Sequence, residues 1–243
     1  MIPVLAGRAD MHMHTTESDG RATVVQMLDF AARQRQLDVL AITDHDRLDA
    51  SLWAASQQGR YPFDIVPGVE VTSRDGHVLA LWVSKPIPSH LSLKETVAAI
   101  HEQAGVAVLA HPFELFIAPR AVLHYIHRLQ RVLDSGVDAV EAFNAGAITP
   151  GGNIATRLRM GHLPLAMMGG SDAHMAASIG SGMTRFHGHS ADDLRRSIAQ
   201  GWTRAEGQRW QIIDYWKLCR NSPPKRRSAS SPMKAVSNPQ TLP

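Results

Sequence analysis

Short apolar runs alternate with helical patterns along most of the chain, and this alternation constrains the fold more than any other feature. Runs of strand character lie at residues 7–11, 37–43, 63–66, 77–83, 106–110, 139–142 and 165–169. Helical patterns lie at residues 23–36, 47–58, 92–104, 119–133, 153–161, 191–200 and 209–218. Strands separated by helices predict βαβ units and a mostly parallel α/β sheet. Such units are numerous enough to close a TIM-like barrel, and an open doubly wound sheet is the alternative.

One segment departs from this alternation. Residues 69–83 contain two strand-like runs around Arg74-Asp75-Gly76, which is typical of a hairpin turn. No internal repeat and no second domain is visible in the sequence. We therefore expect a single domain over residues 1–219.

The positive charge of the chain is concentrated in its last 24 residues. Residues 220–243 hold five basic residues, five prolines, five serines and no acidic residue. Such a segment buries too little apolar surface to offset its ordering entropy, so we expect it to be disordered. Removing its five charges from the net charge of +3 leaves −2 for residues 1–219. The basic character therefore belongs to the tail and does not by itself indicate a nucleic-acid-binding fold.

Several classes of protein are excluded by simple features. No apolar run approaches the roughly 18 residues of a transmembrane helix, and the first residues lack the basic and apolar regions of a signal peptide. Cys219 is the single cysteine, so no internal disulfide can form. We expect a cytoplasmic protein without a membrane partner, and the sequence leaves its oligomeric state open.

Histidines and carboxylates gather where the predicted strands end. Asp10, His12 and His14 alternate after the first strand, so their side chains share one face. The later strand ends carry His45 between two aspartates, Glu70, His111, Glu141 with Asn144, and Asp172 with His174. Each motif alone has an ordinary interpretation, such as a helix cap at Asp46 or Ser171. Together, at one rim of a parallel barrel, they predict a multinuclear centre for Zn, Mn or Fe.

The same motifs resemble the PHP (polymerase and histidinol phosphatase) family of metal-dependent phosphoesterases. They read DMHMHTTESDG (10–20), AITDHD (41–46), PGVE (67–70), LAHPF (109–113), VEAFN (140–144) and GGSDAH (169–174). Weaker similarity continues through IGSGMTRF (179–186) to about Gly201. The resemblance implies a distorted TIM-like (β/α)₇ barrel that binds two or three divalent ions.

The resemblance also implies a role for each matching position. His12 and His14 match ligands of a first ion, Glu70 a bridging carboxylate, and His111 a ligand of a second ion. Asp19 and His45 match ligands nearer a third ion, Asp172 and His174 match a final ligand pair, and His77 stands at a further ligand position. Glu141 and Asn144 match a pair that supports the ligands or contacts the substrate.

Two catalytic roles complete the expected site. His45 or His174 is expected to protonate the leaving alkoxide. Arg185 follows Gly-Met-Thr and is expected to bind a phosphate oxygen with its guanidinium. The chain contains neither Gly-x-Ser-x-Gly nor a P-loop motif, so serine-nucleophile and P-loop chemistry are not expected.

The leading hypothesis is a phosphoesterase that hydrolyses a small phosphorylated substrate, such as a nucleotide, by attack of a hydroxide that bridges the ions. Glu70 and His111 are only 41 residues apart, so the helical insertion common in small relatives that cleave nucleoside bisphosphates is absent. This leaves an open site. The alternatives are a metallohydrolase of carboxylic or carbamate esters and a nuclease that acts on short nucleic acids, with the basic tail as a tether.

Overall fold

The computed structural model describes residues 5–34, 36–116 and 119–220. The segment expected to be disordered therefore lies, apart from Arg220, outside the described residues. Within the described residues, every helix is too short or too polar to cross a membrane.

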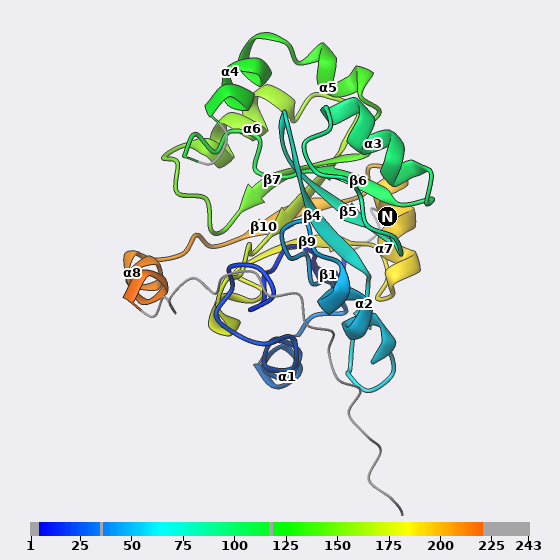
Figure 1. Cartoon of the computed structure of the whole chain (residues 1–243), viewed down its shortest axis with the longest axis vertical. Coiled ribbons are helices and arrows are strands. Elements are labelled where there is room, and N and C mark those ends of the chain that lie inside the picture. Colours follow the sequence, from blue (N-terminus) through cyan, green and yellow to red (C-terminus); the bar gives the residue numbers. More distant parts are fainter. Residues whose placement is uncertain (1–4, 35, 117–118, 221–243) are drawn as a thin grey trace, which may run out of the picture.

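The strands form two five-stranded sheets (Figure 1). The first sheet has the order β10 (Arg204–Gly207), β9 (Gly182–Phe186), β1 (Gly7–Asp10), β2 (Val39–Leu40) and β3 (Asp64–Ile65). The second has the order β4 (Gly68–Ser73), β5 (Gly76–Leu81), β6 (Val106–Leu109), β7 (Ala139–Asn144) and β8 (Ala166–Gly170). Every strand expected from the sequence is present, and β4 and β5 form the expected hairpin.

The two sheets contact each other at both of their edges. Isolated parallel bridges join Met13 to Ala173 and His45 to Glu70. Met13, Ala173 and His45 follow strands, and Glu70 lies within β4. At the β8–β9 junction a Cβ on Gly182 would lie only 2.0 Å from the carbonyl oxygen of Gly170, so only glycine fits there. The predicted mixed α/β architecture is confirmed, but the strands do not form one continuous ladder.

The expectation of a mostly parallel sheet holds for only part of the fold. The pairs β1–β2, β2–β3, β6–β7 and β7–β8 are parallel. The pairs β1–β9, β9–β10, β4–β5 and β5–β6 are antiparallel. β4 and β5 follow each other directly as a hairpin, whereas α7 lies between β9 and β10 although these two strands are also antiparallel.

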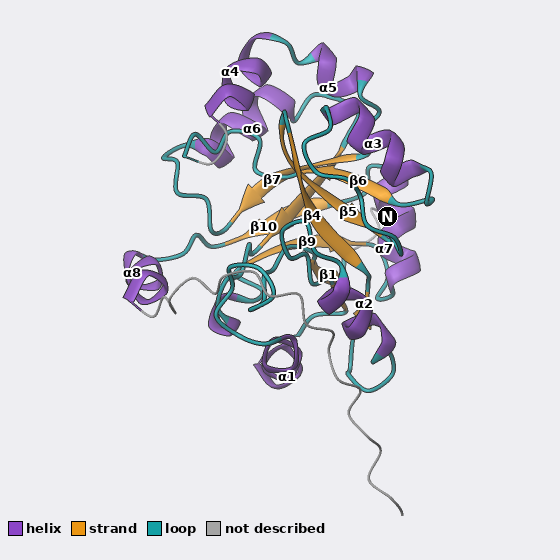
Figure 2. Ribbon diagram, viewed as in Figure 1, coloured by secondary structure: helices purple, strands orange, loops and turns teal. Residues whose placement is uncertain are grey.

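Helices surround the strands on several sides (Figure 2). They are α1 (Val24–Gln34), α2 (Asp49–Ser56), α3 (Leu93–His101), α4 (Pro119–His127), α5 (Gln130–Asp134), α6 (Gly152–Met160), α7 (Ala191–Ala199) and α8 (Ile212–Arg220), with a short 3₁₀ turn at Ala176–Ser178. The single helix expected at residues 119–133 is divided into α4 and α5. The capping box expected at Ser92 and Glu95 forms, and it satisfies free N–H groups at the start of α3.

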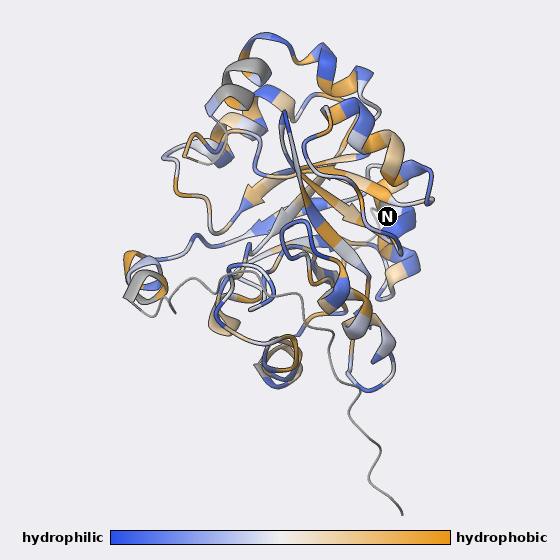
Figure 3. Cartoon of the chain, in the orientation of Figure 1, coloured by the Kyte–Doolittle hydropathy of each residue, from blue (hydrophilic) through white to orange (hydrophobic). Residues whose placement is uncertain are grey.

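One apolar core is shared by both sheets. Met11 and Val39 from the first sheet pack with Leu79, Val108 and Met168 from the second, and all five are almost fully buried. Apolar residues accordingly dominate the central strands (Figure 3). This core lies beneath the strand ends and gives the polar side chains there a rigid base.

Candidate metal centre

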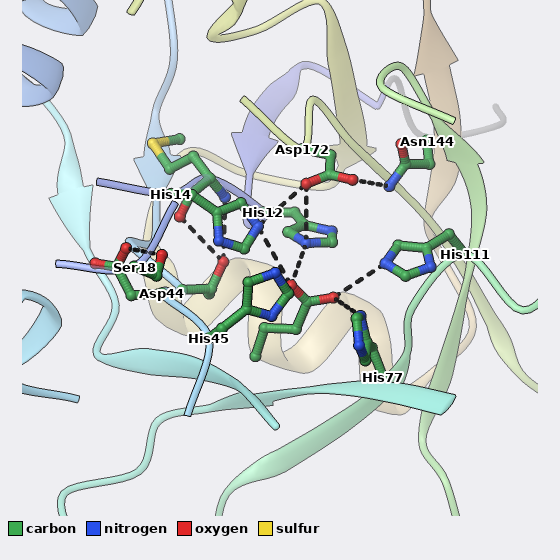
Figure 4. A network of polar contacts seen from close by, with 12 residues as sticks. His12, His14, Ser18, Asp44, His45, His77, His111, Asn144 and Asp172 are labelled. Atoms are coloured by element: carbon green, nitrogen blue, oxygen red, sulfur yellow. Dashed lines mark hydrogen bonds and ion pairs between the residues drawn. The ribbon is translucent and has the colours of Figure 1, made fainter. Parts of the chain in front are cut away.

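The Glu70 carboxylate of β4 is the centre of a largely buried cluster of histidines. Figure 4 shows these histidines converging from several parts of the chain. Glu70 is only 1% exposed. Five imidazole nitrogens lie 3.0–3.3 Å from its two oxygens: those of His12, His14 and His45 at Oε2, and those of His77 and His111 at Oε1. A single carboxylate thus contacts histidines from five separate positions of the chain, the arrangement expected of a bridging ligand.

Alternation beyond β1 directs His12 and His14 into this cluster. The intervening Met11 and Met13 are buried in the apolar core, while both histidines are fully buried among polar groups. The backbone N–H of His14 donates to the carbonyl oxygen of Ala173 at 2.9 Å. The expected common face of the two histidines is therefore observed, and the bridge to Ala173 holds it in place.

Asp172 and His174 follow β8 and reach the same cluster. Asp172 Oδ1 lies 3.4 Å from His12 Nε2 and 3.1 Å from His14 Nε2. The backbone of Asp172 has a φ of 52°, a left-handed conformation that is uncommon outside glycine. His111 has a φ of 25° at the end of β6. Positive φ angles at two strand ends show that the backbone is turned sharply to aim these side chains.

Asp19 closes the cluster on its solvent side. Its Oδ2 lies 3.1 Å from His174 Nε2 and 3.9 Å from His45 Nε2, and its Oδ1 lies 3.7 Å from His14 Nδ1. The Asp19 side chain is 55% exposed, in contrast to the buried Glu70. The cluster is therefore accessible from the side that carries Asp19.

The donor set fits several divalent cations. Groups of three or four ligand atoms lie within 4.8 Å of one another, and between them they include every residue expected as a ligand except Asp172, which contacts His12 and His14 directly. His12 Nε2, both nitrogens of His14, Glu70 Oε2 and His77 Nδ1 are buried without a hydrogen-bond partner. Buried polar atoms are rarely left unpaired, and lone pairs that converge in this way suit metal ions. The cluster is consistent with more than one bound ion.

Electrostatics in the metal-free protein show how tightly these groups interact. Burial lowers the pKa of His14, but the adjacent carboxylates of Asp172 and Glu70 raise it to about 10. Burial likewise opposes ionisation of Glu70, yet the neighbouring histidines hold its pKa well below the usual range. The same is true of Asp172 beside His12 and His14. Because metal ligands must be deprotonated, ions and protons compete for these histidines.

Glu141 and Asn144 lie behind the ligands. Glu141 Oε1 is 2.9 Å from His12 Nδ1, and its Oε2 accepts hydrogen bonds from the backbone N–H of His111 at 3.0 Å and from Asn144 Nδ2 at 2.9 Å. Asn144 Nδ2 also donates to Asp172 Oδ2 at 3.2 Å. Both residues are buried. These contacts favour orientation of the ligands, the first of the two expected roles, and contact with a substrate stays a prediction.

Two buried aspartates support the site in ways that the motifs did not reveal. Asp10 accepts hydrogen bonds from the backbone N–H groups of Ser171 at 3.0 Å and Gly180 at 2.8 Å, and burial raises its pKa to about 6. Asp44 accepts from the backbone N–H of Thr15 at 2.7 Å and from the Ser18 hydroxyl at 2.5 Å. Asp10 thus joins β1 to β8, and Asp44 fixes the loop that carries Asp19. In the sequence both are carboxylates at the end of an apolar run. The proposed metal ligands show the same pattern, so the pattern does not distinguish the two roles.

The structure does not bring Arg185 to the cluster, which corrects the expected phosphate contact. In β9, Arg185 pairs with Arg8 of β1, and its Nη2 donates to the carbonyl oxygen of Leu5 at 2.7 Å. Arg8 precedes His12 by four residues, which is about 13 Å along an extended chain. Because β9 runs antiparallel to β1, its Gly182 end lies near the ligands and Arg185 lies at the opposite end.

Sequence comparisons place this architecture among known proteins. A family model described as PHP-associated matches residues 159–203. An uncharacterized protein of Methanocaldococcus jannaschii is 28% identical over 148 residues, which is 57% of this chain and 82% of that protein. The phosphoribosyl 1,2-cyclic phosphate 1,2-diphosphodiesterase of Eggerthella lenta is 40% identical over 91 residues, which is 35% of this chain and 34% of that enzyme.

Solved structures share the fold at low sequence identity. A two-domain protein of Bacteroides vulgatus, containing a predicted PHP-like metal-dependent phosphoesterase, has a TM-score of 0.65 at 19% identity over 83% of this chain and 64% of its own. A Bifidobacterium adolescentis protein, also assigned by prediction as a metal-dependent phosphoesterase, has a TM-score of 0.60 at 18% identity over 87% and 99%. The lesion-specific endonuclease of Pyrococcus furiosus has a TM-score of 0.58 at 14% identity over 89% and 67%. The chain thus shares the fold of PHP-like metal-dependent phosphoesterases, and its residues 159–203 match the PHP-associated family model.

Proposed function

We propose that this chain hydrolyses a phosphate ester of a small molecule at the Glu70-centred cluster. The observation that carries the proposal is the convergence of five histidines on one buried carboxylate, with several of their lone pairs unpaired. Unpaired buried polar atoms destabilise the fold, so such a cluster is not expected to serve stability by itself. We infer that it serves to bind metal ions for a reaction.

We assign the ligands to three positions that share Glu70 or His14. His12, His14, Glu70 and Asp172 surround the first position, where Glu70 and Asp172 each contact both histidines. Glu70 with its two Oε1 neighbours, His77 and His111, surrounds the second. Asp19, His45 and His174 surround the third, on the solvent side, together with His14 Nδ1. Mn, Zn and Fe all suit a mixed imidazole and carboxylate donor set.

The bound ions would supply an activated water at neutral pH and neutralise charge on the phosphate oxygens. The protein residues provide orientation and a proton. Glu141 holds His12 so that its Nε2 faces Glu70. His45 and His174 are the most exposed histidines of the cluster, at 30% and 16%, and one of them is the proposed donor to the leaving alkoxide.

We further propose that the two sheets act as one distorted (β/α)₇-type barrel in a single domain over residues 1–219. The shared core and the bridges at both junctions support this interpretation. Most of the proposed ligands follow a strand, as in other barrels with active sites, whereas Glu70 and His77 lie within β4 and β5.

The substrate class follows from the open rim. The α3-containing connection between β5 and β6 is short, so no inserted lobe stands over His77 and His111. A small phosphate ester suits such a site, and the Eggerthella lenta relative is named as acting on a phosphoribosyl cyclic phosphate. A nuclease is the second candidate, because the Pyrococcus furiosus endonuclease shares this fold.

A panel of four substrates tests the proposal. Purified protein loaded with Mn²⁺ would be assayed with p-nitrophenyl phosphate, bis-p-nitrophenyl phosphate, p-nitrophenyl acetate and a 5′-phosphorylated oligonucleotide, beside Glu70→Gln. We expect hydrolysis of a p-nitrophenyl phosphate ester that the substitution abolishes. Turnover confined to the acetate would establish the carboxylic-ester alternative, and turnover confined to the oligonucleotide would establish a nuclease.

A further inference from the structure

The segment that follows β10 forms one side of the metal centre. The backbone N–H of Trp210 donates to the carbonyl oxygen of Ala145 at 2.9 Å, so this segment lies against the loop that follows β7. The Trp210 side chain is 8% exposed and packs with Phe143 and Ala145. The chain then continues into α8, which lies outside the ring of other helices (Figure 1).

Trp210 brings this segment close to two proposed ligands. Its ring centroid is 6.1 Å from that of His174, in an edge-on arrangement with an interplanar angle of 82°. A Cβ on Gly146 would lie 3.3 Å from Asp172 Cβ and 3.4 Å from Trp210 Cζ2. The backbone at Gly146 is therefore sandwiched between the Trp210 ring and Asp172, and the position of the segment relative to the metal centre is well defined.

Two hydrogen-bond donors of the segment converge beside this point. Arg209 Nη2 donates to the carbonyl oxygen of Ala147 at 2.5 Å, and the Tyr215 hydroxyl donates to the same oxygen at 3.3 Å. The Tyr215 ring is 5.4 Å from the Trp210 ring, so the three side chains form one group. Arg209 is exposed, and its guanidinium carries more N–H donors than the Ala147 contact uses.

The charges around Tyr215 connect this group to the metal centre. Burial raises the pKa of Tyr215, the Arg209 guanidinium lowers it, and the carboxylates of Glu114 and Asp172 raise it. Asp172, a proposed metal ligand, is therefore among the charges that act on this group. Arg185 of β9, the arginine expected to bind phosphate, lies beside Arg8, at the end of β1 that is away from the ligands.

We propose that Arg209 binds a second anionic group of the substrate, either a phosphate or a carboxylate. This inference rests on the proposed function, in which the metal centre holds the phosphate that is cleaved. A guanidinium binds both kinds of oxyanion through paired N–H donors. Arg209 then selects phosphate esters that carry a further negative charge over those that carry one phosphate alone.

Binding of non-hydrolysable phosphonates tests this role without turnover. The probes are phenylphosphonate, its 4-carboxyl derivative and its 4-phosphono derivative, titrated calorimetrically into Mn²⁺-loaded protein. The variants are Arg209→Ala and Arg209→Lys. Arg195→Ala is the matched control, because Arg195 of α7 also donates to a backbone carbonyl, that of Ala104, and lies 5.5 Å from a tryptophan ring.

We expect wild-type protein to bind the two doubly anionic probes more tightly than phenylphosphonate. Arg209→Ala should weaken at least one of these two at least tenfold and change the phenylphosphonate dissociation constant less than twofold. Arg209→Lys should recover part of the loss, and Arg195→Ala should change nothing. The affected probe identifies the second group as carboxylate, phosphate or both.

Results with either protein could overturn the inference. Wild-type protein would do so by binding all three probes equally or by binding none of them. Arg209→Ala would do so by binding all three probes as tightly as wild type does, or by losing affinity for all three alike. Because no turnover is needed, either result is separate from the hydrolysis assay, which decides whether the chain is a phosphoesterase of small molecules.

Discussion

Glu141→Gln should impair metal binding although Glu141 occupies none of the proposed ligand positions. In the wild-type protein Glu141 is an acceptor on both oxygens, for His12 Nδ1 on one side and for the His111 N–H and Asn144 Nδ2 on the other. A glutamine has one acceptor and one donor end. If its NH₂ group faces His12, Nδ1 must become the acceptor and the proton moves to Nε2, which then cannot bind an ion. If the NH₂ group faces the other way, it opposes two N–H donors.

The expected loss of metal affinity follows from the role of Glu141 as hydrogen-bond partner of a metal-binding histidine. Losing the residue that fixes the tautomer of a metal-binding histidine typically weakens metal binding ten- to one-hundredfold, or by about 1.4–2.8 kcal/mol. Competition between the protein and a chromophoric chelator for Mn²⁺ or Zn²⁺ measures this change. Metal analysis of the dialysed protein should show a lower content of bound ions in the variant.

Glu114→Gln provides the control for burial. Glu114 is also buried at the rim, but it accepts hydrogen bonds from the backbone N–H groups of Ile148 at 2.8 Å and Thr149 at 3.0 Å. Both variants should unfold at a lower temperature, and only Glu141→Gln should lose metal affinity. Unchanged affinity in folded Glu141→Gln, or an equal loss in Glu114→Gln, would refute the assigned role.

Three further outcomes are expected. Removing the ions with EDTA should lower the free energy of unfolding by about 2.7 kcal/mol for each occupied site, relative to protein held at a hundredfold excess over the dissociation constant, as checked by thermal melts; equal melts would contradict a structural contribution from the ions. Metal affinity should rise between pH 6 and 9, because Asp172 and Glu70 raise the pKa of His14 to about 10, so that an ion must displace its proton; a flat profile in calorimetric titrations would count against this competition. Arg185→Ala should lower the melting temperature by removing the hydrogen bond to Leu5 while changing phosphate release less than twofold; a tenfold loss of turnover would restore Arg185 to the site.

The order of elements and the proposed ligands were accessible from the sequence because both depend on local patterns. A period of two separates His12 and His14 from Met11 and Met13, so the strand itself decides which side chains face the core. Glu70 stands out as a carboxylate within an apolar run, and burying such a charge is costly unless it has partners. The structure brings these residues together as the motifs predict.

Other features depend on strand direction and on the way the sheets meet. The sequence around Arg185 predicts a strand but not its orientation, and the antiparallel pairing of β9 with β1 turns that arginine away from the ligands. The role of Glu141 depends on the groups that its carboxylate contacts, and one of these is the His12 imidazole, more than 100 residues earlier in the chain. Neither relation leaves a periodic signal in the sequence.

The sequence by itself determined the alternating α/β order, the strand ends that carry ligands and the residue types available to metal ions. Only the tertiary structure decided that Glu70 is the common contact of five histidines, that Glu141 and Asn144 contact the proposed ligands, and that the Trp210 ring lies beside His174. The physical reason is the range of the interactions. Side-chain alternation is fixed within a few residues, whereas a contact such as that of Trp210 with the Gly146 loop exists only after distant strands have paired.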